Sequence, residues 1–262
     1  MGYDLKGKHV LVTGASTGIG AGLAEGFAQR GATVGICARR TDLLDEVLGR
    51  CREHAPDSQA WTIDLGELDG LADFAKRASD ELGGVDVLVN NAGMPKRKTV
   101  FAIDVPTIEY VMRLNYFSPV RLTMALLPEI VERGGRFVFL SSVAARLSPP
   151  GEGAYGASKA AISAFAESMQ VDLRNTNVRV HLVYPGVIDT ELFRIPDNDP
   201  LLASIEALPV DALVGPVLDM VEQETFEVAV PDWFGEIFAG KYKDVGAFMD
   251  GTMAYARSLD PQ

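Results

Sequence analysis

Short apolar runs alternate with helix-like stretches along most of the chain, and this alternation constrains the fold more than any other feature. Runs typical of buried strands lie at 9–14, 32–38, 59–64, 85–91, 135–142, 178–186 and 226–232. Stretches with helical spacing or composition lie between them, at 19–31, 41–54, 67–83, 106–133 and 154–175. Strands that alternate with helices form a parallel sheet covered on both faces. We therefore expect an α/β fold with a doubly wound parallel sheet of about seven strands.

The composition supports one folded domain and excludes some function classes. The chain has 262 residues, of which 47% are hydrophobic and 23% charged, which is enough for a substantial core. The 36 acidic residues outnumber the 24 basic ones, which gives a net charge of −12. A nucleic-acid-binding protein needs a basic surface, and so does nonspecific attachment to an anionic membrane. We therefore expect a single domain over 1–262.

Several features predict a cytoplasmic protein without a membrane span. No apolar run has the length needed to cross a bilayer, and no signal peptide precedes the first strand. Gly2 follows Met1, but Lys6 stands where a myristoylation motif has Ser or Thr. Cys37 and Cys51 make no disulfide framework, which favours a reducing compartment.

A glycine-rich turn joins the first predicted strand to the first predicted helix. The segment 13–20 reads TGASTGIG, with glycines at 14, 18 and 20. Glycine lets the backbone turn tightly and approach an anion, which then faces the amides of the helix N-terminus. A simple connecting turn is the alternative, but the order of strand, turn and helix favours a phosphate-binding cradle.

Two arginines follow the second predicted strand. Many dinucleotide-binding folds carry an acidic residue there, which binds the adenosine ribose hydroxyls. Here Ala38 is followed by Arg39 and Arg40, just before a helix N-terminus where cations are slightly unfavourable. A bound 2′-phosphate would explain this placement better than a solvated basic pair, so the sequence favours NADP over NAD.

The stretch 142–159 carries a possible acid–base group. Tyr155 and Lys159 are four residues apart in a predicted helix, so they share one face. A cation beside a phenol favours the phenolate and lowers the tyrosine pKa from its usual value near 10. Ser142 stands thirteen residues before Tyr155, at the carboxyl end of a predicted strand. Ligands of open α/β sheets bind at that edge.

Together these motifs resemble the short-chain dehydrogenase/reductase family, which has a Rossmann-type fold. The matching elements are T-G-x-x-x-G-x-G at 13–20, Asp64, N-N-A-G at 90–93, Asn115, Ser142, Y-x-x-x-K at 155–159 and P-G-x-x-x-T at 185–190. They occur in the family's order over about three quarters of the chain. The resemblance implies an oxidoreductase that interconverts an alcohol and a carbonyl group on a fairly apolar small molecule.

The resemblance also implies roles for individual residues. Tyr155 would be the acid and base, Ser142 would bind the carbonyl oxygen, and Lys159 would bind the nicotinamide ribose and lower the Tyr155 pKa. Asn115 would hold a water of a proton relay, although a helical asparagine can also serve backbone structure. The implied cofactor-binding residues are Gly14, Ser16, Thr17, Gly18, Ile19, Gly20, Arg39, Arg40, Asp64, Leu65, Asn90, Ala92, Gly93, Tyr155, Lys159, Pro185, Gly186, Ile188 and Thr190.

Alternatives stay open at this level. Such a chain could be an NAD-dependent dehydrogenase, an epimerase or dehydratase, or a dinucleotide-sensing module without turnover. Ser141 competes with Ser142, but neighbouring strand residues point to opposite faces, and the spacing favours Ser142. We expect no metal site, because the three histidines are scattered and His181 lies in an apolar strand. We also expect a homodimer through 106–133 and 154–175, with a tetramer as the alternative.

The last quarter is where the family pattern stops. The resemblance implies a substrate lid at about 191–212, and a C-terminal extension at about 233–262 departs from the usual ending of the family. Six apolar residues would either line the substrate lid or fill its own core, namely Leu192, Phe193, Ile195, Leu201, Leu202 and Ile205. Further apolar residues of the extension recur at helical spacing, namely Phe234, Phe238, Tyr242, Val245 and Met249. They predict a terminal helix, packed on its own domain or on a sister subunit. A wall of the substrate pocket and a contact with lipid are rarer options.

Overall fold

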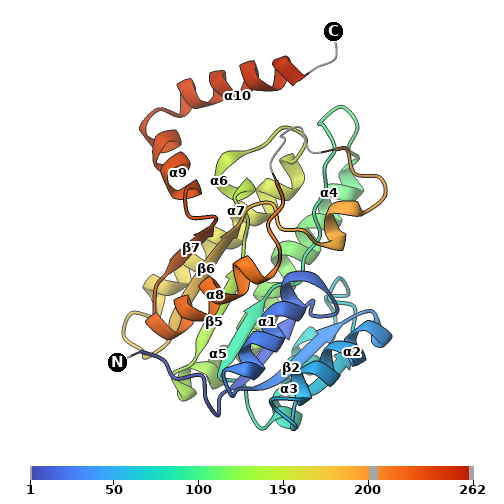
Figure 1. Ribbon diagram of the computed structural model, residues 1–262, viewed down its shortest axis with the longest axis vertical. Coiled ribbons are helices and arrows are strands. Elements are labelled where there is room, and N and C mark those ends of the chain that lie inside the picture. The colour runs from blue at the N-terminus through green and yellow to red at the C-terminus, as the bar shows by residue number, and fades with distance from the viewer. Residues whose placement is uncertain (1, 201–205, 260–262) are drawn as a thin grey trace.

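A seven-stranded parallel sheet forms the centre of the molecule (Figure 1). The structure is a computed structural model that describes residues 2–200 and 206–259. Its strands are β1 (His9–Thr13), β2 (Thr33–Ala38), β3 (Gln59–Thr62), β4 (Val87–Asn90), β5 (Arg136–Leu140), β6 (Arg179–Pro185) and β7 (Glu227–Val230). Their order across the sheet is β3-β2-β1-β4-β5-β6-β7, and every neighbouring pair is parallel. The predicted fold class is confirmed.

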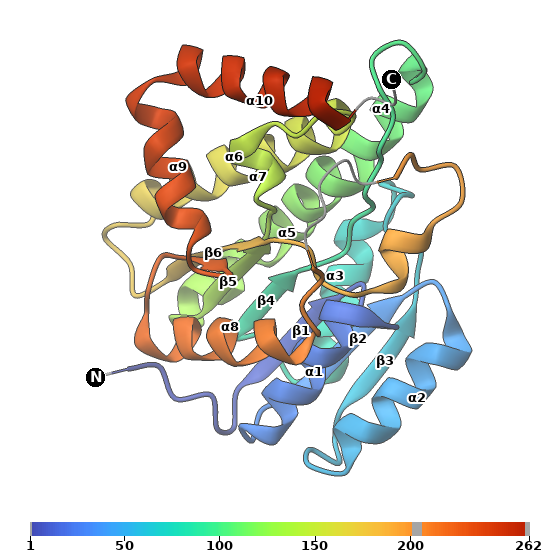
Figure 2. The same cartoon turned by 45° about the horizontal axis from the view of Figure 1, so that its top comes forward.

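Helices cover both faces of the sheet (Figure 2). The longer ones are α1 (Gly18–Gln29), α2 (Thr41–Arg52), α3 (Leu71–Leu82), α5 (Ser118–Arg133), α7 (Gly153–Asp172) and α8 (Asp211–Gln223). The buried side chains of α1, α2 and α8 share one core cluster, and those of α3, α5 and α7 share the other. The remaining helical segments are α4 (Val105–Met112), η1 (Arg113–Phe117), α6 (Ala144–Leu147), η2 (Glu191–Arg194), α9 (Phe234–Lys243) and α10 (Val245–Leu259).

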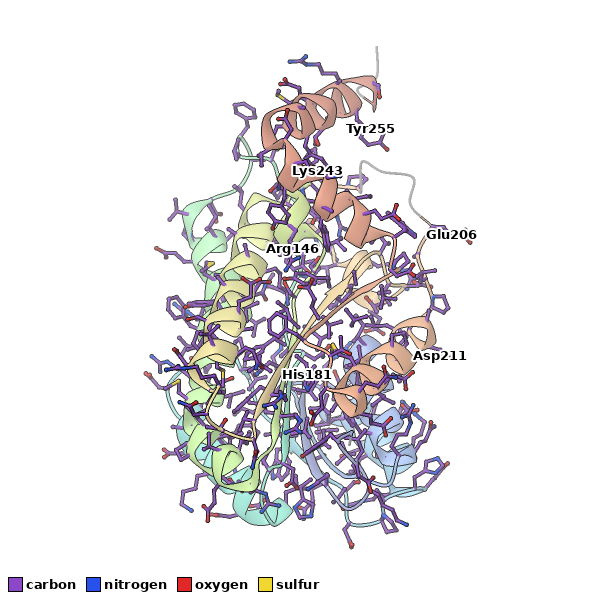
Figure 3. All side chains as sticks on the ribbon, turned by 90° about the vertical axis from the view of Figure 1, so that its left-hand side faces the viewer. Arg146, His181, Glu206, Asp211, Lys243 and Tyr255 are labelled. Atoms are coloured by element: carbon purple, nitrogen blue, oxygen red, sulfur yellow. The ribbon has the colours of Figure 1, made fainter. Side chains whose placement is uncertain are left out.

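The core lies on both sides of the sheet because successive strand residues point to opposite faces. In β1, Val10 and Val12 belong to one core cluster, and Leu11 belongs to the other. His181 of β6 lies inside the protein in Figure 3. Its Nδ1 lies 2.7 Å from the Thr225 carbonyl oxygen, and burial lowers the pKa of the imidazole to about 4. This histidine is therefore neutral at physiological pH and belongs to the core.

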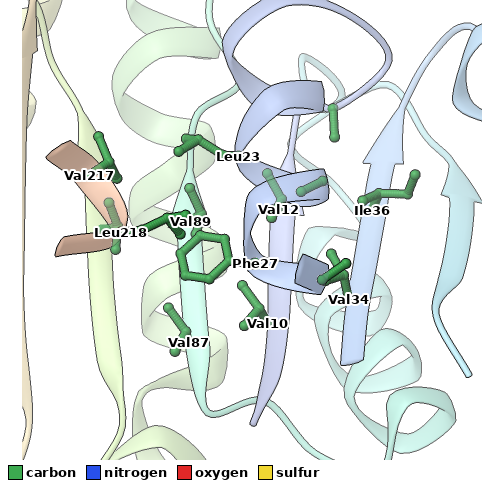
Figure 4. Packing of buried hydrophobic residues seen from close by; sticks show 14 of the residues in the cluster. Val10, Val12, Leu23, Phe27, Val34, Ile36, Val87, Val89, Val217 and Leu218 are labelled. Atoms are coloured by element: carbon green, nitrogen blue, oxygen red, sulfur yellow. The ribbon is translucent and has the colours of Figure 1, made fainter. Parts of the chain in front are cut away.

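The packing of α1 on the sheet illustrates how the core is built. Phe27 is fully buried, and Figure 4 shows its ring among Val10, Val87, Val89 and Leu218. Fully burying an aromatic side chain of this size contributes about 1.5–3 kcal/mol. The buried face of α1 packs on the sheet along the helix, from Leu23 to Phe27, and this packing holds the helix that begins at the glycine turn.

Three helical regions differ from the sequence prediction. The stretch 106–133 is not one regular helix, because the π-helical turn η1 separates α4 from α5. The extension forms two helices instead of one, and α8 was not predicted at all. Gly215 and Pro216 within α8 weaken its helical signal. The helix forms because Leu213, Val217, Leu218 and Val221 of α8 are buried in the core cluster that also contains α1.

The strand order reverses between β1 and β4. Strands 1, 2 and 3 run outward in one direction, and strands 4 to 7 run outward in the other. In open α/β sheets, the crevice for a ligand lies at the carboxyl ends of the strands beside such a reversal. The glycine turn after β1 and the 90–93 segment at the end of β4 therefore meet at this crevice.

Two observations on the described residues concern a membrane span and a metal site. Within residues 2–200 and 206–259, no helix combines the length and the apolar character that crossing a bilayer requires. In the same part of the chain, no three His, Cys, Asp or Glu side chains are grouped so that they could hold a metal ion.

Candidate active site

One cavity of about 690 Å³ runs along the carboxyl edge of the sheet. One end, which we call the arginine end, is lined by Arg39 and Arg40. The other, the tyrosine end, is lined by Ser142, Tyr155 and Lys159. The cavity brings together all the predicted catalytic and cofactor-binding residues except Asn90 and Asn115.

The glycine turn forms the floor between the two ends. Gly14 and Gly18 have φ values of +67° and +59°, which side chains rarely adopt. A Cβ on Gly14 would lie 2.7 Å from the Ala92 Cα, so the turn packs against the 90–93 segment. Thr17, the N-cap of α1, makes no side-chain cap, and the first turn of this helix carries no acidic residue. The helix N-terminus therefore suits an anionic group such as a pyrophosphate.

The arginine end holds both predicted cations near hydroxyls and carboxylates. Arg40 is the N-cap of α2, and its Nη2 donates to Thr17 Oγ1 at 2.7 Å and to Ser16 Oγ at 3.2 Å. Its Nη1 lies 2.7 Å from Glu191 Oε2. Arg39 Nη1 lies 3.7 Å from Asp64 Oδ2. The Arg40 guanidinium therefore reaches the glycine turn, and each arginine lies beside one carboxylate.

The two asparagines at the end of β4 differ in direction. Asn90 Nδ2 donates to Thr123 Oγ1 of α5 at 3.1 Å, so this predicted cofactor-binding side chain points away from the cavity. Asn91 lines the cavity, and its Nδ2 donates to the carbonyl oxygens of Thr13 and Gly14 at 2.8 and 3.1 Å. Sequence reasoning missed Asn91, although it follows Asn90 directly in the N-N-A-G motif. Its side chain holds the glycine turn in place.

Two segments supply the groups of the tyrosine end. Ser142 follows β5, and Tyr155 and Lys159 lie on α7, where i and i+4 share one face. The Lys159 Nζ lies 5.9 Å from the centroid of the Tyr155 ring. It donates to the Leu140 carbonyl oxygen at 2.6 Å, at the end of β5. The structure thus brings serine, tyrosine and lysine to one place.

The pKa values at this end differ from the sequence expectation. Burial raises the pKa of Tyr155 to about 12, and a hydrogen bond with Ser142 partly offsets that rise. The charge of Glu152 raises it further. Burial lowers the pKa of Lys159 to about 8. We expected Lys159 to lower the Tyr155 pKa, but its amine is turned to a backbone carbonyl, and Ser142 is the main group that lowers it.

Asn115 lies behind the cavity wall, in the π-helical turn η1. Its Nδ2 donates to the Met94 carbonyl oxygen at 3.0 Å and to Ser158 Oγ at 2.9 Å, and its Oδ1 accepts from the Met94 amide at 2.8 Å. A Cβ on Gly93 would lie 3.1 Å from this Oδ1 and 3.3 Å from the Lys159 Nζ. Glycine at 93 therefore lets the asparagine and the lysine approach the same spot from two sides.

Ser141 has structural hydrogen bonds. Its Oγ donates to the Lys159 carbonyl oxygen at 3.0 Å and lies 2.8 Å from Ser163 Oγ. These bonds join β5 to α7, so they hold the strand and the helix that present the tyrosine end. Ser142 Oγ instead accepts from the Ala144 amide at 3.1 Å and faces the cavity.

The loop after β6 closes the tyrosine end. Gly186 donates its amide to the Val230 carbonyl oxygen at 2.8 Å, which holds this loop against β7. Thr190 and Ile188 are buried and line the cavity, and Ile188 pairs with Leu208. A Cβ on Gly18 would lie 3.0 Å from the Thr190 methyl group. The predicted nicotinamide contacts are therefore adjacent to the glycine turn.

Four charged residues that line the cavity were not among the predicted site residues, namely Arg97, Glu152, Glu191 and Arg194. Arg97 is 6% exposed, and its Nε donates to the Asp199 carbonyl oxygen at 2.8 Å. Glu152 is the residue before α7, three positions before Tyr155, and burial raises the pKa of its carboxyl to about 6. The spacing of three residues between Glu152 and Tyr155 could have indicated Glu152 in the sequence, because residues i and i+3 lie on the same side of a helix.

The lid and the extension both reach the cavity. Leu192 and Ile195 line it, which is one of the two alternatives considered for them, and Leu192 is 43% exposed. The other lid residues predicted to be apolar lining are the Phe193 side chain, Leu201, Leu202 and Ile205, and these lie outside the described residues. From the extension, Phe234 of α9 and four residues of α10 line the cavity, namely Phe248, Thr252, Tyr255 and Ala256.

The fold and the cavity together define a dinucleotide-binding α/β protein with a serine, a tyrosine and a lysine at one end of the cleft. The family model described as short chain dehydrogenase matches residues 8–199. The chain therefore belongs to the short-chain dehydrogenase/reductase family of oxidoreductases, as the sequence motifs predicted.

Known proteins resemble the chain to different extents. A dehydrogenase/reductase SDR family protein 7-like from Drosophila melanogaster is 41% identical over 194 residues, which are 72% of this chain. This chain spans 60% of the length of that relative. A solved short chain dehydrogenase from Burkholderia cenocepacia, in complex with NADP, is 30% identical with a TM-score of 0.80, and the match covers 99% of this chain and all of that one.

A second solved structure shows the fold alone. It is a short chain dehydrogenase/reductase from Burkholderia phymatum in complex with NAD, with 20% identity and a TM-score of 0.84. The match covers 93% of this chain and 95% of that one.

Proposed function

We propose that this chain is an NADP(H)-dependent oxidoreductase that interconverts an alcohol and a ketone or aldehyde on a fairly apolar small molecule. One observation carries the proposal. A single cavity is lined at one end by the glycine turn with Arg39 and Arg40, and at the other by Ser142, Tyr155 and Lys159. An elongated cofactor could therefore bind through its phosphates at one end and present its reactive ring at the other.

The residues of the tyrosine end would share the work of proton transfer. A phenol with a pKa of about 12 is protonated at neutral pH, so Tyr155 is set to donate a proton to a carbonyl oxygen. The Ser142 hydroxyl, beside Tyr155, would bind the same oxygen and hold it in place. In the reverse direction, Tyr155 would accept the alcohol proton, and the hydrogen bond from Ser142 would favour the phenolate.

Lys159 would act on the cofactor as well as on Tyr155. Its buried amine would donate to the ribose hydroxyls next to the nicotinamide. Asn115, which Gly93 separates from that amine, would complete a proton path toward solvent. The bound nicotinamide would supply or accept the hydride, while the protein supplies position and charge.

Two observations support NADP over NAD. Arg39 and Arg40 lie at the place where an NAD-binding fold usually carries an acid, and Arg40 already contacts the hydroxyls of Ser16 and Thr17. The relative from Burkholderia cenocepacia, at 30% identity, was solved with NADP. A guanidinium pair beside two hydroxyls suits the 2′-phosphate through charge-assisted hydrogen bonds.

The Tyr155→Phe variant tests the proposed function. We expect its turnover of NADPH with a panel of ketones and aldehydes to fall by about 10²-fold or more, because the proton donor is lost. The NADPH affinity, measured by cofactor fluorescence, should stay within about twofold, because the ring remains. Tyr242→Phe is the matched control, because this tyrosine of α9 is exposed, and it should change neither.

Two outcomes would contradict the proposal. Full activity in Tyr155→Phe would remove this residue from the mechanism. NADPH binding by the unmodified protein without oxidation across the whole panel would favour a dinucleotide sensor instead.

A further inference from the structure

Helix α10 runs across the outer side of the cavity and is attached at one end. Figure 1 shows it at the top of the molecule, apart from the sheet and its covering helices. Asp244, with φ −153° and ψ 93°, is the single extended residue between α9 and α10. The position of α10 therefore depends on α9.

Helix α9 is fixed to the fold by aromatic contacts. Phe234 and Phe238 are 3% and 5% exposed, and the Phe238 ring meets Tyr184 of β6 edge-on at 5.6 Å between centroids. The Arg146 guanidinium of α6 lies 4.3 Å from the Tyr184 ring and 5.3 Å from the Phe238 ring. The Lys241 Nζ donates to the Arg146 carbonyl oxygen. These contacts fix α9 to the rest of the fold, and α10 continues from the C-terminal end of α9.

One face of α10 is turned toward the cavity. Phe248, Thr252 and Ala256, at steps of four residues, are half-buried and line it, and Tyr255, which is 49% exposed, lines it as well. Met253, at 45% exposure, is not among the lining residues. Figure 3 shows Tyr255 on this helix, above the body of the protein. The three half-buried lining residues thus recur at the helical period, and the face that they form covers a cavity instead of a core.

The facing side of the cavity is also apolar. Leu147, Pro149 and Pro150 line it from the connection between β5 and α7, and Leu192 and Ile195 line it from the lid. Thr252 donates its hydroxyl to the Phe248 carbonyl oxygen at 2.9 Å, so it offers its methyl group to the cavity. Aromatic and aliphatic side chains from α10, the lid and the β5–α7 connection therefore line the cavity, which also contains charged side chains such as those of Arg97 and Glu152.

We infer that the inner face of α10 is the distal wall of the substrate site, and that Phe248 and Tyr255 select an elongated, apolar carbonyl compound or alcohol. This inference rests on the proposed function. A substrate whose reacting oxygen contacts Tyr155 and Ser142 reaches these rings only if it carries a long apolar chain. Longer chains bury more apolar surface on α10, so their transition states gain affinity that short chains lack.

Chain-length preference tests the inference. The probes are 2-butanone, 2-octanone and 2-dodecanone, reduced with NADPH by the full-length chain, and the readout is kcat/KM for each. We expect the ratio of 2-dodecanone to 2-butanone to fall by about tenfold in Phe248→Ala and in Tyr255→Ala, since the lost contacts act on the long chain alone. Met253→Ala, on the outer face of the same helix, should keep the ratio of the unmodified protein.

A binding measurement separates this inference from the proposed function. With NADP present, 2-dodecanone should raise the melting temperature of the unmodified protein more than 2-butanone does, and Phe248→Ala should lose that difference. If 2-dodecanone raises the melting temperature more than 2-butanone does but neither ketone is reduced, the proposed function is wrong, and α10 is still the distal wall of the binding site. If Phe248→Ala and Tyr255→Ala leave both the kinetic ratio and the melting difference unchanged, α10 is not the wall.

Discussion

Arg40 and Glu191 form an ion pair at the arginine end of the cavity, with 2.7 Å between Arg40 Nη1 and Glu191 Oε2. The pair joins the end of β2 to the segment that follows Thr190. The same guanidinium donates to Ser16 and Thr17, so it lies where a 2′-phosphate would need it. In the proposed binding of NADP, Glu191 would therefore compete with that phosphate for the arginine. Arg40 holds the pKa of the Glu191 carboxyl below its usual value.

The Glu191→Gln variant should bind NADP more tightly. Removing the carboxylate frees Arg40 and removes a negative charge that would repel the 2′-phosphate, so we expect the Kd for NADP to fall about two- to fivefold. The Kd for NAD, which lacks that phosphate, should change less. Titration with both cofactors checks this. Asp189→Asn, which removes the neighbouring ion pair with Arg194, is the control.

The Arg39→Ala variant tests the second arginine of the arginine end. Arg39→Ala should weaken NADP binding while it leaves NAD binding nearly unchanged, because only the phosphate needs the cation. Unchanged discrimination between the two cofactors in this variant would argue for NAD as the cofactor.

Lys159→Ala should damage binding and turnover together. The amine would bind the nicotinamide ribose, so its loss should weaken NADP affinity by about tenfold or more. It would also hold charge beside the reacting groups, so kcat should fall by about 10² or more. Cofactor titration and steady-state kinetics measure the two effects. Lys76→Ala, at an exposed position of α3, is the control. A fall in kcat with intact affinity would limit Lys159 to the chemical step.

Glu152→Gln should change the pH dependence of alcohol oxidation. The Glu152 carboxyl has a pKa of about 6, so it is charged at the pH of an oxidation assay, and its charge raises the pKa of Tyr155. Removing the charge lowers the Tyr155 pKa, so the phenolate forms at lower pH and the rising limb of the kcat/KM profile shifts to lower pH. Glu132→Gln on α5 is the control. An unshifted profile would show that Glu152 does not act on Tyr155.

The same carboxyl links stability to pH. Its folded-state pKa of about 6 lies above the ordinary value of 4.5, because burial penalises the charged form. The stability that the neutral form contributes is complete below 4.5 and is lost as the pH rises through 6. Glu152→Gln should therefore gain in melting temperature relative to the unmodified protein as the pH rises from 4.5 to 7. A difference that is constant over this range would contradict the assignment.

Phe27→Ala should destabilise the fold. The ring is fully buried between α1 and the sheet, so its removal leaves a cavity in a region that cannot collapse easily. We expect a loss of about 3–5 kcal/mol in the free energy of unfolding, measured by urea denaturation. Met124→Ala, on the exposed surface of α5, should change it by less than about 0.5 kcal/mol.

The strands were predictable because a strand buried on both faces needs an apolar run. The run 85–91 predicted β4, whose residues Val87–Asn90 are all buried. The helix α8 was not predictable in this way, because its partner surface on α1 decides it. A Cβ on Gly26 would lie 2.7 Å from the Val214 side chain, so the small residues of α1 let α8 approach closely. That closeness is a property of the pair and not of either segment.

The site, like the fold, has parts that the sequence predicted and parts that only the folded chain determined. The order and spacing of the motifs predicted the glycine turn, Ser142, Tyr155 and Lys159, because turn geometry and helical periodicity act over a few residues. Tertiary structure decided that the Lys159 amine faces the Leu140 carbonyl, and that burial raises the pKa of Tyr155 instead of lowering it. It also brought α10, about a hundred residues further along the chain, over the cavity. The burial of a side chain and its distance from remote segments are set only when the chain folds. The local sequence pattern therefore cannot predict them.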